Sequence, residues 1–248
     1  MSIAKYGRLQ ALLLATTSGL ALGAAFSGVA AAQTVISHVA AGETKVNSGT
    51  ITASGSVDAA VGVDQTGKFT NSAGGRIVAT NGSVGVGVVT AVASGTTSIV
   101  NQGLIEATKP TGSTDDTLAA IYVKNVPVVI ENSGSILGKN GAHGIVVTGV
   151  ASGTSTITNT GLIKADRPTD SSDTVAAIYL TNASAKIVNS GTILGTGGAH
   201  GIVVGTSVAA GSTADTTIDN SGLIKSDSGN AIAVYALDHQ QRHDHFRD

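Results

Sequence analysis

The chain contains no cysteine, and it is poor in aromatic, charged and proline residues. Without cysteine it can form neither disulfides nor cysteine-based zinc or iron–sulfur sites. Only 3% of the residues are aromatic and none is tryptophan, which leaves few stacking platforms for a sugar-binding groove. The formal net charge of −2 offers no basic stripe to neutralise phosphates, and this argues against a nucleic-acid binder.

Small, apolar and hydroxyl-bearing residues dominate instead. Glycine accounts for 33 of the 248 residues, and hydrophobic residues make up 42%. That apolar content, combined with a small net charge, does not fit intrinsic disorder. Small and β-branched side chains are typical of thin, regular β-coils, so we expect an all-β fold.

Residues 1–32 have the features of a secretory signal peptide. Lys5 and Arg8 form a charged start, residues 9–22 form an apolar core, and Ala30–Ala32 provide a small-residue cleavage site. A membrane anchor is the alternative interpretation. The apolar core contains too many Gly, Ser and Thr residues for a convincing span of about 20 residues. We therefore expect cleavage and export through the inner membrane.

A five-residue unit, Asn-x-Gly-x-Ile, recurs through the rest of the chain at intervals of 24 to 31 residues. A motif with a nearly fixed period predicts a repeat architecture. An apolar residue stands two positions before the Asn in every copy except the first, where Lys45 takes its place. The second copy, Asn71 to Ile77, has two extra residues. The units begin at Asn47, Asn71, Asn101, Asn132, Asn159, Asn189 and Asn220.

Apolar residues alternate with polar ones on both sides of the unit, which predicts two short strands joined at a tight corner. Asn and Gly suit such a corner because both tolerate positive φ. A third apolar run follows in each complete repeat, as in residues 118–123 and 175–180. Three strands per repeat predict a right-handed, single-stranded parallel β-helix of about seven coils.

Stacked coils would place the seven Asn side chains above one another at a spacing of about 4.8 Å. Each amide could then donate a hydrogen bond to the next and accept one from the previous, forming a ladder. The simpler alternative is that these residues only form turns. Both interpretations are structural, and neither makes the Asn residues catalytic.

The chain divides into four parts. Residues 1–32 are the signal peptide, residues 33–44 a lead-in or N-terminal cap, residues 45–237 the β-helix, and residues 238–248 an atypical charged tail. The abrupt change in composition at the tail suggests a truncated, frameshifted or fragmentary product. Residues 101–158 and 159–219 are near duplicates, so two coils form a superrepeat. The first coil of each carries a polar insert loop, residues 109–116 and 167–173, expected on one side of the solenoid.

The Asn-x-Gly-x-Ile repeats, following a signal peptide in a Gly-, Thr-, Val- and Ala-rich chain, resemble the passenger domains of bacterial autotransporters. The resemblance covers roughly residues 45–237. It implies a β-helix that crosses the outer membrane through a C-terminal translocator barrel and is displayed on the cell or released. Such a barrel needs about a dozen amphipathic strands, and this sequence does not contain them. Many members are adhesins or aggregation factors, which implies a host or neighbouring-cell surface, or another copy of the chain, as partner.

Histidines are the first candidates for a metal site. His143 and His200 occupy equivalent places in the superrepeat, where both could face solvent beside the insert loops. His239, His243 and His245 in the tail have spacings that can hold a metal loosely. Coordination needs three or more convergent ligands, and duplication alone explains the matched pair. We therefore expect no metal and no cofactor.

Asp115, Asp116, Asp170 and Asp173 form an acidic cluster on the insert loops. β-helical polysaccharide lyases and hydrolases line carboxylates along a groove, so a carbohydrate-active enzyme is the alternative function. Solvated loop turns would use the same residues. No nucleophile elbow, phosphate-binding Gly loop or calcium-binding repeat is present. The favoured expectation is a cell-surface or secreted structural or adhesive protein without catalytic residues.

Overall fold

The computed structural model describes residues 37–55, 59–89, 95–113, 115, 117–168, 171, 173–207 and 215–237. The predicted signal peptide and the charged tail lie outside these residues. All 22 regular elements in the described part are β-strands, so the fold is all-β. Nothing in this part forms a helix of the length and apolarity needed to cross a lipid bilayer.

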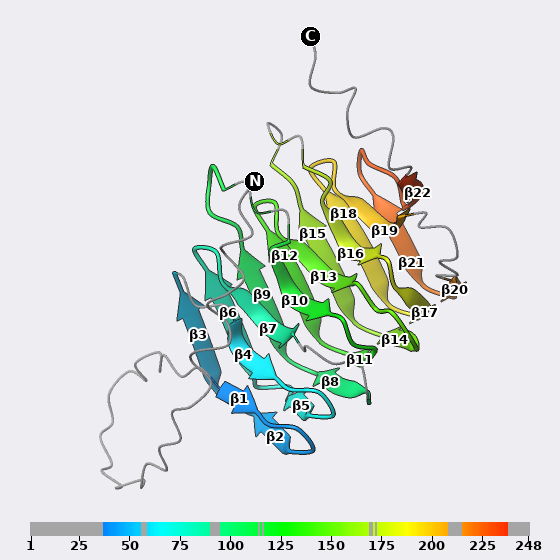
Figure 1. The fold of residues 1–248 in the computed structure, drawn as a ribbon. Coiled ribbons are helices and arrows are strands. Elements are labelled where there is room, and N and C mark those ends of the chain that lie inside the picture. Colours follow the sequence, from blue (N-terminus) through cyan, green and yellow to red (C-terminus); the bar gives the residue numbers. More distant parts are fainter. Residues whose placement is uncertain are drawn as a thin grey trace, which may run out of the picture. The chain divides into compact units, whose positions relative to one another are not determined.

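The strands form three parallel sheets, and consecutive strands along the chain belong to different sheets (Figure 1). Sheet 1 contains every third strand from β1 onward. Its members are β1 (Ser37–Val39), β4 (Ala59–Val63), β7 (Val84–Val89), β10 (Ala119–Lys124), β13 (His143–Thr148), β16 (Ala176–Thr181), β19 (His200–Ser207) and β22 (Ile232–Leu237).

Sheets 2 and 3 have seven strands each, which matches the seven Asn units. Sheet 2 contains β2 (Thr44–Asn47), β5 (Lys68–Asn71), β8 (Thr97–Asn101), β11 (Val128–Asn132), β14 (Thr154–Asn159), β17 (Ser184–Asn189) and β20 (Thr216–Asn220). Sheet 3 contains β3 (Thr50–Ser54), β6 (Arg76–Thr80), β9 (Leu104–Thr108), β12 (Ser135–Lys139), β15 (Leu162–Asp166), β18 (Thr192–Thr196) and β21 (Leu223–Ser226).

The predicted parallel β-helix with three strands per coil is therefore confirmed. Each Asn ends a strand of sheet 2, and the Ile of the unit lies on the following strand of sheet 3. In register, Asn132 pairs with Asn159 and Ile136 with Ile163, so equivalent residues lie directly above one another. The right-handed sense of the winding stays a prediction.

The interior of the solenoid is a stack of apolar side chains contributed by all three sheets. A buried isoleucine contributes about 2 kcal/mol relative to an exposed one, so the stacking of coils stabilises the fold strongly. The stacked side chains, each at most 1% exposed, are Phe69, Ile99, Ile130, Ile157 and Ile187 from sheet 2, Ile77, Ile105, Ile136, Ile163 and Ile193 from sheet 3, and Ile121, Ile145, Ile178 and Ile202 from sheet 1.

The Asn ladder is confirmed. The side-chain amide of each Asn donates to the side-chain oxygen of the Asn one coil further on, at 2.7–2.8 Å in all six steps. Asn71, Asn101 and Asn159 are fully buried. Their amides also donate to backbone carbonyls, as Asn159 does to Thr192 at 3.2 Å. The ladder therefore supplies hydrogen bonds to polar groups that have no access to water.

The expected reason for the motif's glycine was wrong. No Asn or Gly of the seven units has a positive φ; this conformation occurs at other corners, for example at Asn125 and Asn182. A Cβ on Gly134 would instead lie 2.2 Å from the carbonyl oxygen of Gly103 in the preceding coil. Glycine is required there because the backbones of stacked corners touch.

Glycine and alanine alternate at one position of the two-coil superrepeat. In its coils without an insert loop, a Cβ on Gly138 would lie 2.2 Å from the carbonyl oxygen of Ala142, and one on Gly195 would meet the equivalent carbonyl at 2.0 Å. The coils with an insert loop carry buried alanines at this position, Ala107 and Ala165. Ala79 is also buried at this position and precedes an equally short turn, so the length of the corner does not by itself decide between glycine and alanine.

Candidate functional site

A cluster of ionisable side chains lies where sheet 3 passes into sheet 1. This corner is formed by residues 109–113, 115, 117–118, 139–143, 167–168, 171, 173–175, 196–200 and 226–231. We call this region the insert corner. Two of its segments contain the insert loops, and the other three are short turns. Lys109, Arg167, Asp173, His143 and His200 all belong to it, so it is the first place to look for binding or catalysis.

An ion pair joins the two insert loops. The ammonium of Lys109 donates to Oδ2 of Asp173 at 2.6 Å, across the intervening turn of residues 139–142. This contact confirms that both loops lie on the same side of the solenoid. Lys109 is only 3% exposed, and its backbone carbonyl accepts from the Asn140 side chain at 2.7 Å. The hydrogen bond from Lys109 holds the pKa of Asp173 below its usual value, against the opposing effect of burial.

The corresponding contact is different one superrepeat later. Arg167 replaces Lys109, but two coils further on residues 226–231 form a short turn in place of a third insert loop. Asp227 of that turn accepts hydrogen bonds from the backbone amides of Gly197 and Gly198, at 2.8 and 3.1 Å. These two bonds lower the pKa of Asp227. Asp173 and Asp227 therefore hold neighbouring turns together.

His143 and His200 each accept a hydrogen bond from the next coil. Nδ1 of His143 accepts the backbone N–H of Ala176 at 3.1 Å, and Nδ1 of His200 accepts that of Asn230 at 2.9 Å. Accepting a hydrogen bond requires Nδ1 to be unprotonated. His143 is only 2% exposed, so the expectation that both rings could face solvent was wrong for this residue. Its ring packs against Tyr179, with centroids 5.0 Å apart.

Acidification should weaken the hydrogen bond between Asn230 and His200. Burial, aided by the charge of Arg167, lowers the pKa of His200 below 6.5, so the unfolded chain binds the proton more readily than the folded chain. Stability should therefore fall as the pH drops through 6.5. Thermal melts followed by circular dichroism between pH 8 and pH 5 should show this loss, and His200→Gln should reduce it. An identical pH dependence in the two proteins would contradict the assignment.

The outer face of sheet 1 carries a packed row of tyrosine and valine that the sequence analysis did not single out. Tyr122, Val146, Tyr179 and Val203 are partners in successive strands. Val146 and Val203 are at most 2% exposed although they lie on the outer face. Tyrosines flank Val146 on both sides, and Tyr179 and Ala233 flank Val203. The recurring Ala-Ala-Ile-Tyr sequence, at residues 119–122 and 176–179, was the available signal.

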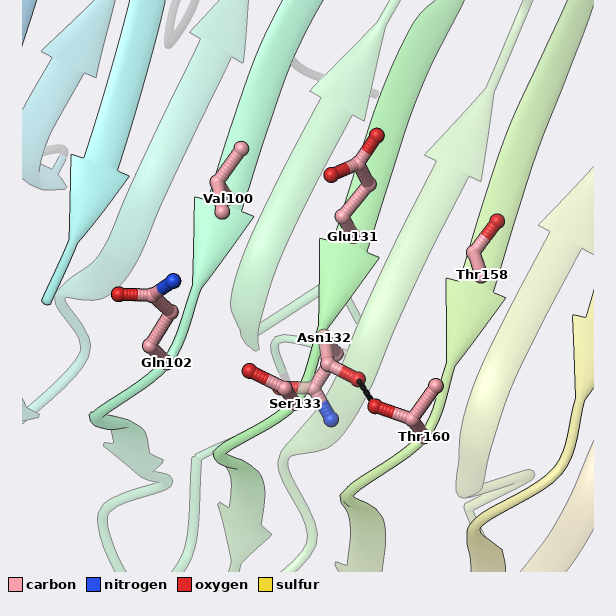
Figure 2. Close-up of a pocket in the computed structure, with 7 residues that line it drawn as sticks. All are labelled: Val100, Gln102, Glu131, Asn132, Ser133, Thr158 and Thr160. Carbon is pink, nitrogen blue, oxygen red and sulfur yellow. Dashed lines mark hydrogen bonds between the residues drawn. The ribbon is translucent and has the colours of Figure 1, made fainter. Parts of the chain in front are cut away.

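A shallow hollow of ≈ 200 Å³ lies beside the Asn ladder (Figure 2). Val100, Glu131 and Thr158 lie side by side above it, and polar corner residues complete it. Glu131 is its one ionisable side chain. Drug-sized ligands are usually enclosed by pockets of about 300–1,000 Å³. The hollow is a shallow groove between stacked corners and is smaller than the usual ligand pocket. It is lined by Val100, Gln102, Glu131, Asn132, Ser133, Thr158 and Thr160.

The acidic cluster that the enzyme alternative requires is only partly within the described residues. Asp116 and Asp170 lie outside them. Asp115 accepts from the backbone amide and the hydroxyl of Thr117, at 3.0 and 2.7 Å, which is turn chemistry. Asp173 is paired with Lys109. Across the described part of the chain, no group of three or more His, Asp or Glu side chains is placed to hold a metal ion.

Comparison of the chain with protein-family models, curated proteins and solved structures gave no match. The functional argument therefore depends on the chain's own residues. At the insert corner, the ionisable side chains that could bind a ligand or take part in catalysis make contacts between coils. At the Asn corner, the polar side chains form the ladder.

Proposed function

We propose that the chain is a β-helical passenger of the autotransporter type, present at the cell surface or secreted, with a structural or adhesive role and no catalysis. One observation carries this proposal: the repeated polar residues serve the stacking of coils. Asn159 is buried in the ladder, Lys109 is paired with Asp173, and His143 accepts a backbone N–H of the next coil. These contacts support a rigid scaffold that presents its outer faces.

The sequence features of residues 1–32 support export. The resemblance of the repeats to autotransporter passengers favours display at the outer membrane through a translocator that residues 45–237 do not provide. The proposed partners are a host or neighbouring-cell surface, or another copy of the chain. The regular outer faces of the three sheets provide long surfaces for such contacts.

Export and adhesion are tested in turn. Expressed in a Gram-negative bacterium, the full chain should leave the cytoplasm and lose its first 32 residues, as shown by fractionation and N-terminal sequencing. The matched chain without residues 1–32 should stay in the cytoplasm. Beads coated with the folded protein should then bind cells, or one another, more than beads coated with heat-unfolded protein. Retention of the full chain in the cytoplasm, or equal binding by both kinds of bead, would contradict the proposal.

A further inference from the structure

One outward-facing leucine stands in each coil of sheet 3 from β9 to β18. Leu104 and Leu162 come one residue before the buried isoleucine of their coil, whereas Leu137 and Leu194 come one residue after it. Side chains alternate between the two faces of a strand, so all four leucines lie on the outer face, where each is half-buried. The strands of sheet 2 stack without any leucine, so stacking does not require these four. We define the leucine face as the outward side chains of β9, β12, β15 and β18.

The leucine face lies in the middle of the solenoid. Each of its four strands has a neighbouring strand of sheet 3 on both sides, and all of their residues belong to the described part of the chain. Its composition and exposure therefore do not depend on how either end of the solenoid is completed.

The charged side chains of the leucine face follow a fixed order along the solenoid. Glu106, Leu137 and Lys164 are register partners in the successive strands β9, β12 and β15. A negative and a positive group therefore stand on either side of Leu137, about 9.6 Å apart. Glu106 pairs with Lys139 at 2.9 Å, while Lys164 forms no ion pair with any other described residue.

A second copy with the reverse order of coils would present opposite charges to this face. A two-fold axis parallel to β12, between two leucine faces, keeps the strand direction and reverses the order of the coils. β9 of one copy then faces β15 of the other, so Glu106 faces Lys164 of the second copy, twice by symmetry. Leu104 faces Leu162 of the second copy, and Leu137 faces its own counterpart. Opposite charges meet and apolar side chains cover one another.

The other two-fold arrangement is disfavoured. An axis along the solenoid keeps the order of the coils, so each strand faces itself, Glu106 faces Glu106 and Lys164 faces Lys164. Like charges placed opposite one another destabilise a complex. In the favoured arrangement Lys139 also faces its counterpart, but each is paired with Glu106 of its own copy, and Asp166 of the second copy lies on the neighbouring strand.

The balance of charge on the leucine face favours a second copy over a lipid surface. In β9, β12 and β15 the charged residues are Glu106 and Asp166 on one side of the balance and Lys139 and Lys164 on the other, which gives no net charge. Anionic lipid surfaces attract segments with an excess of Lys or Arg. Balanced charges in a fixed order instead suit a partner with the same charges in the reverse order.

We propose that the leucine face binds the leucine face of a second copy in this two-fold arrangement. Facing sheets in β-sandwiches pack about 10 Å apart with their strands within about 30° of each other, which this arrangement allows. Five strands of five residues, β6 to β18, cover about 400 Å² per copy. Stable interfaces bury at least about 1,200 Å² in total, so the dimer is weak and reversible. The proposal deepens the self-association named in the proposed function and rests on that part of it alone.

Sedimentation equilibrium of the full chain over a wide range of concentrations tests the dimer. We expect a weak dimer that Leu137→Ser weakens about tenfold, because Leu137 lies at the two-fold axis and packs against its counterpart. Val129→Ser is the matched control: Val129 belongs to the same coil and is also half-buried, but it lies on the outer face of sheet 2. Its replacement should leave the dimer intact. Both variants should keep the strand signal in circular dichroism.

An exchange of charges tests the arrangement. Lys164→Glu or Glu106→Lys alone should weaken dimerisation about tenfold, because each variant then places like charges opposite one another twice. Mixing the two variants should restore dimerisation, because both facing pairs of the mixed dimer again have opposite charges. A folding defect in either variant would not produce this recovery.

A chain that stays monomeric up to millimolar concentration would overturn the proposal. Equal effects of Leu137→Ser and Val129→Ser, or two charge variants that fail to pair when mixed, would overturn it as well. Binding of a monomeric chain to phosphatidylglycerol vesicles, lost in Leu137→Ser, would assign the face to a lipid surface instead. An exported, cell-binding chain that is monomeric would contradict the dimer alone, whereas a dimeric chain retained in the cytoplasm would contradict only the proposed export.

Discussion

Replacing Asn159 with alanine should lower the free energy of unfolding by roughly 3 kcal/mol, because it breaks the ladder in its middle. Asn159 is 0% exposed. Its side-chain oxygen accepts from Asn132, and its amide donates to the side chain of Asn189 and to the carbonyl of Thr192. Removing it leaves a buried oxygen of Asn189 without this donor, and the amide of Asn132 without this acceptor.

Urea unfolding followed by far-ultraviolet circular dichroism measures the effect. Asn220→Ala is the matched control, since Asn220 has the same motif position but is exposed and has one ladder neighbour, Asn189. Its replacement should cost at most about 1 kcal/mol. Equal losses in the two variants would show that burial in the ladder is not what stabilises the fold.

Gly161→Ala should destabilise the chain by roughly 3 kcal/mol or more, because two backbones already touch at this corner. The new Cβ would lie 2.2 Å from the carbonyl oxygen of Gly134 and 2.7 Å from the carbonyl carbon of Ser133. Both atoms belong to the preceding coil, which could move away only by separating stacked strands. A flexible side chain could yield at this distance, but a backbone within a ladder of hydrogen bonds cannot.

Gly49 provides the control, because it occupies the same motif position in the first coil and a Cβ added there would meet nothing within 4 Å beyond its chain neighbours. Gly49→Ala should be neutral or stabilising by about 0.5 kcal/mol, since alanine restricts the unfolded chain and meets no obstacle. The same urea titration compares the two variants. If Gly161→Ala were as stable as Gly49→Ala, the glycine would be required for a reason other than contact between coils.

Periodicity in the sequence was sufficient to predict the coil. Asn-x-Gly-x-Ile, with an apolar residue two positions earlier, places Ile130 and Asn132 on one strand and Ile136 on the next, and the structure has them there. The ladder followed because equivalent residues in parallel coils must lie above one another. The sequence also showed the one exception to this pattern, since Lys45 occupies the position that an apolar residue takes in the other units.

The insert corner was only half predictable. The duplication showed that the two insert loops are equivalent. Equivalent positions in the coils of a solenoid lie on the same side, so the two loops were expected there. It did not show that Lys109 would reach past a whole coil to Asp173, because that contact depends on side-chain direction and on the shortness of the turn at residues 139–142. For the same reason the sequence could not distinguish a solvent-exposed His143 from one that accepts a backbone N–H and packs on Tyr179.

The sequence by itself thus determined the fold class, the repeat and the identity of the ladder, because each depends only on which residues recur at which spacing. Tertiary structure decided why the corner residue is glycine and which polar groups are buried. These features depend on distances between neighbouring coils, such as that between Gly161 and Gly134, and on the side-chain packing around residues such as His143. Spacing along a chain does not contain those distances.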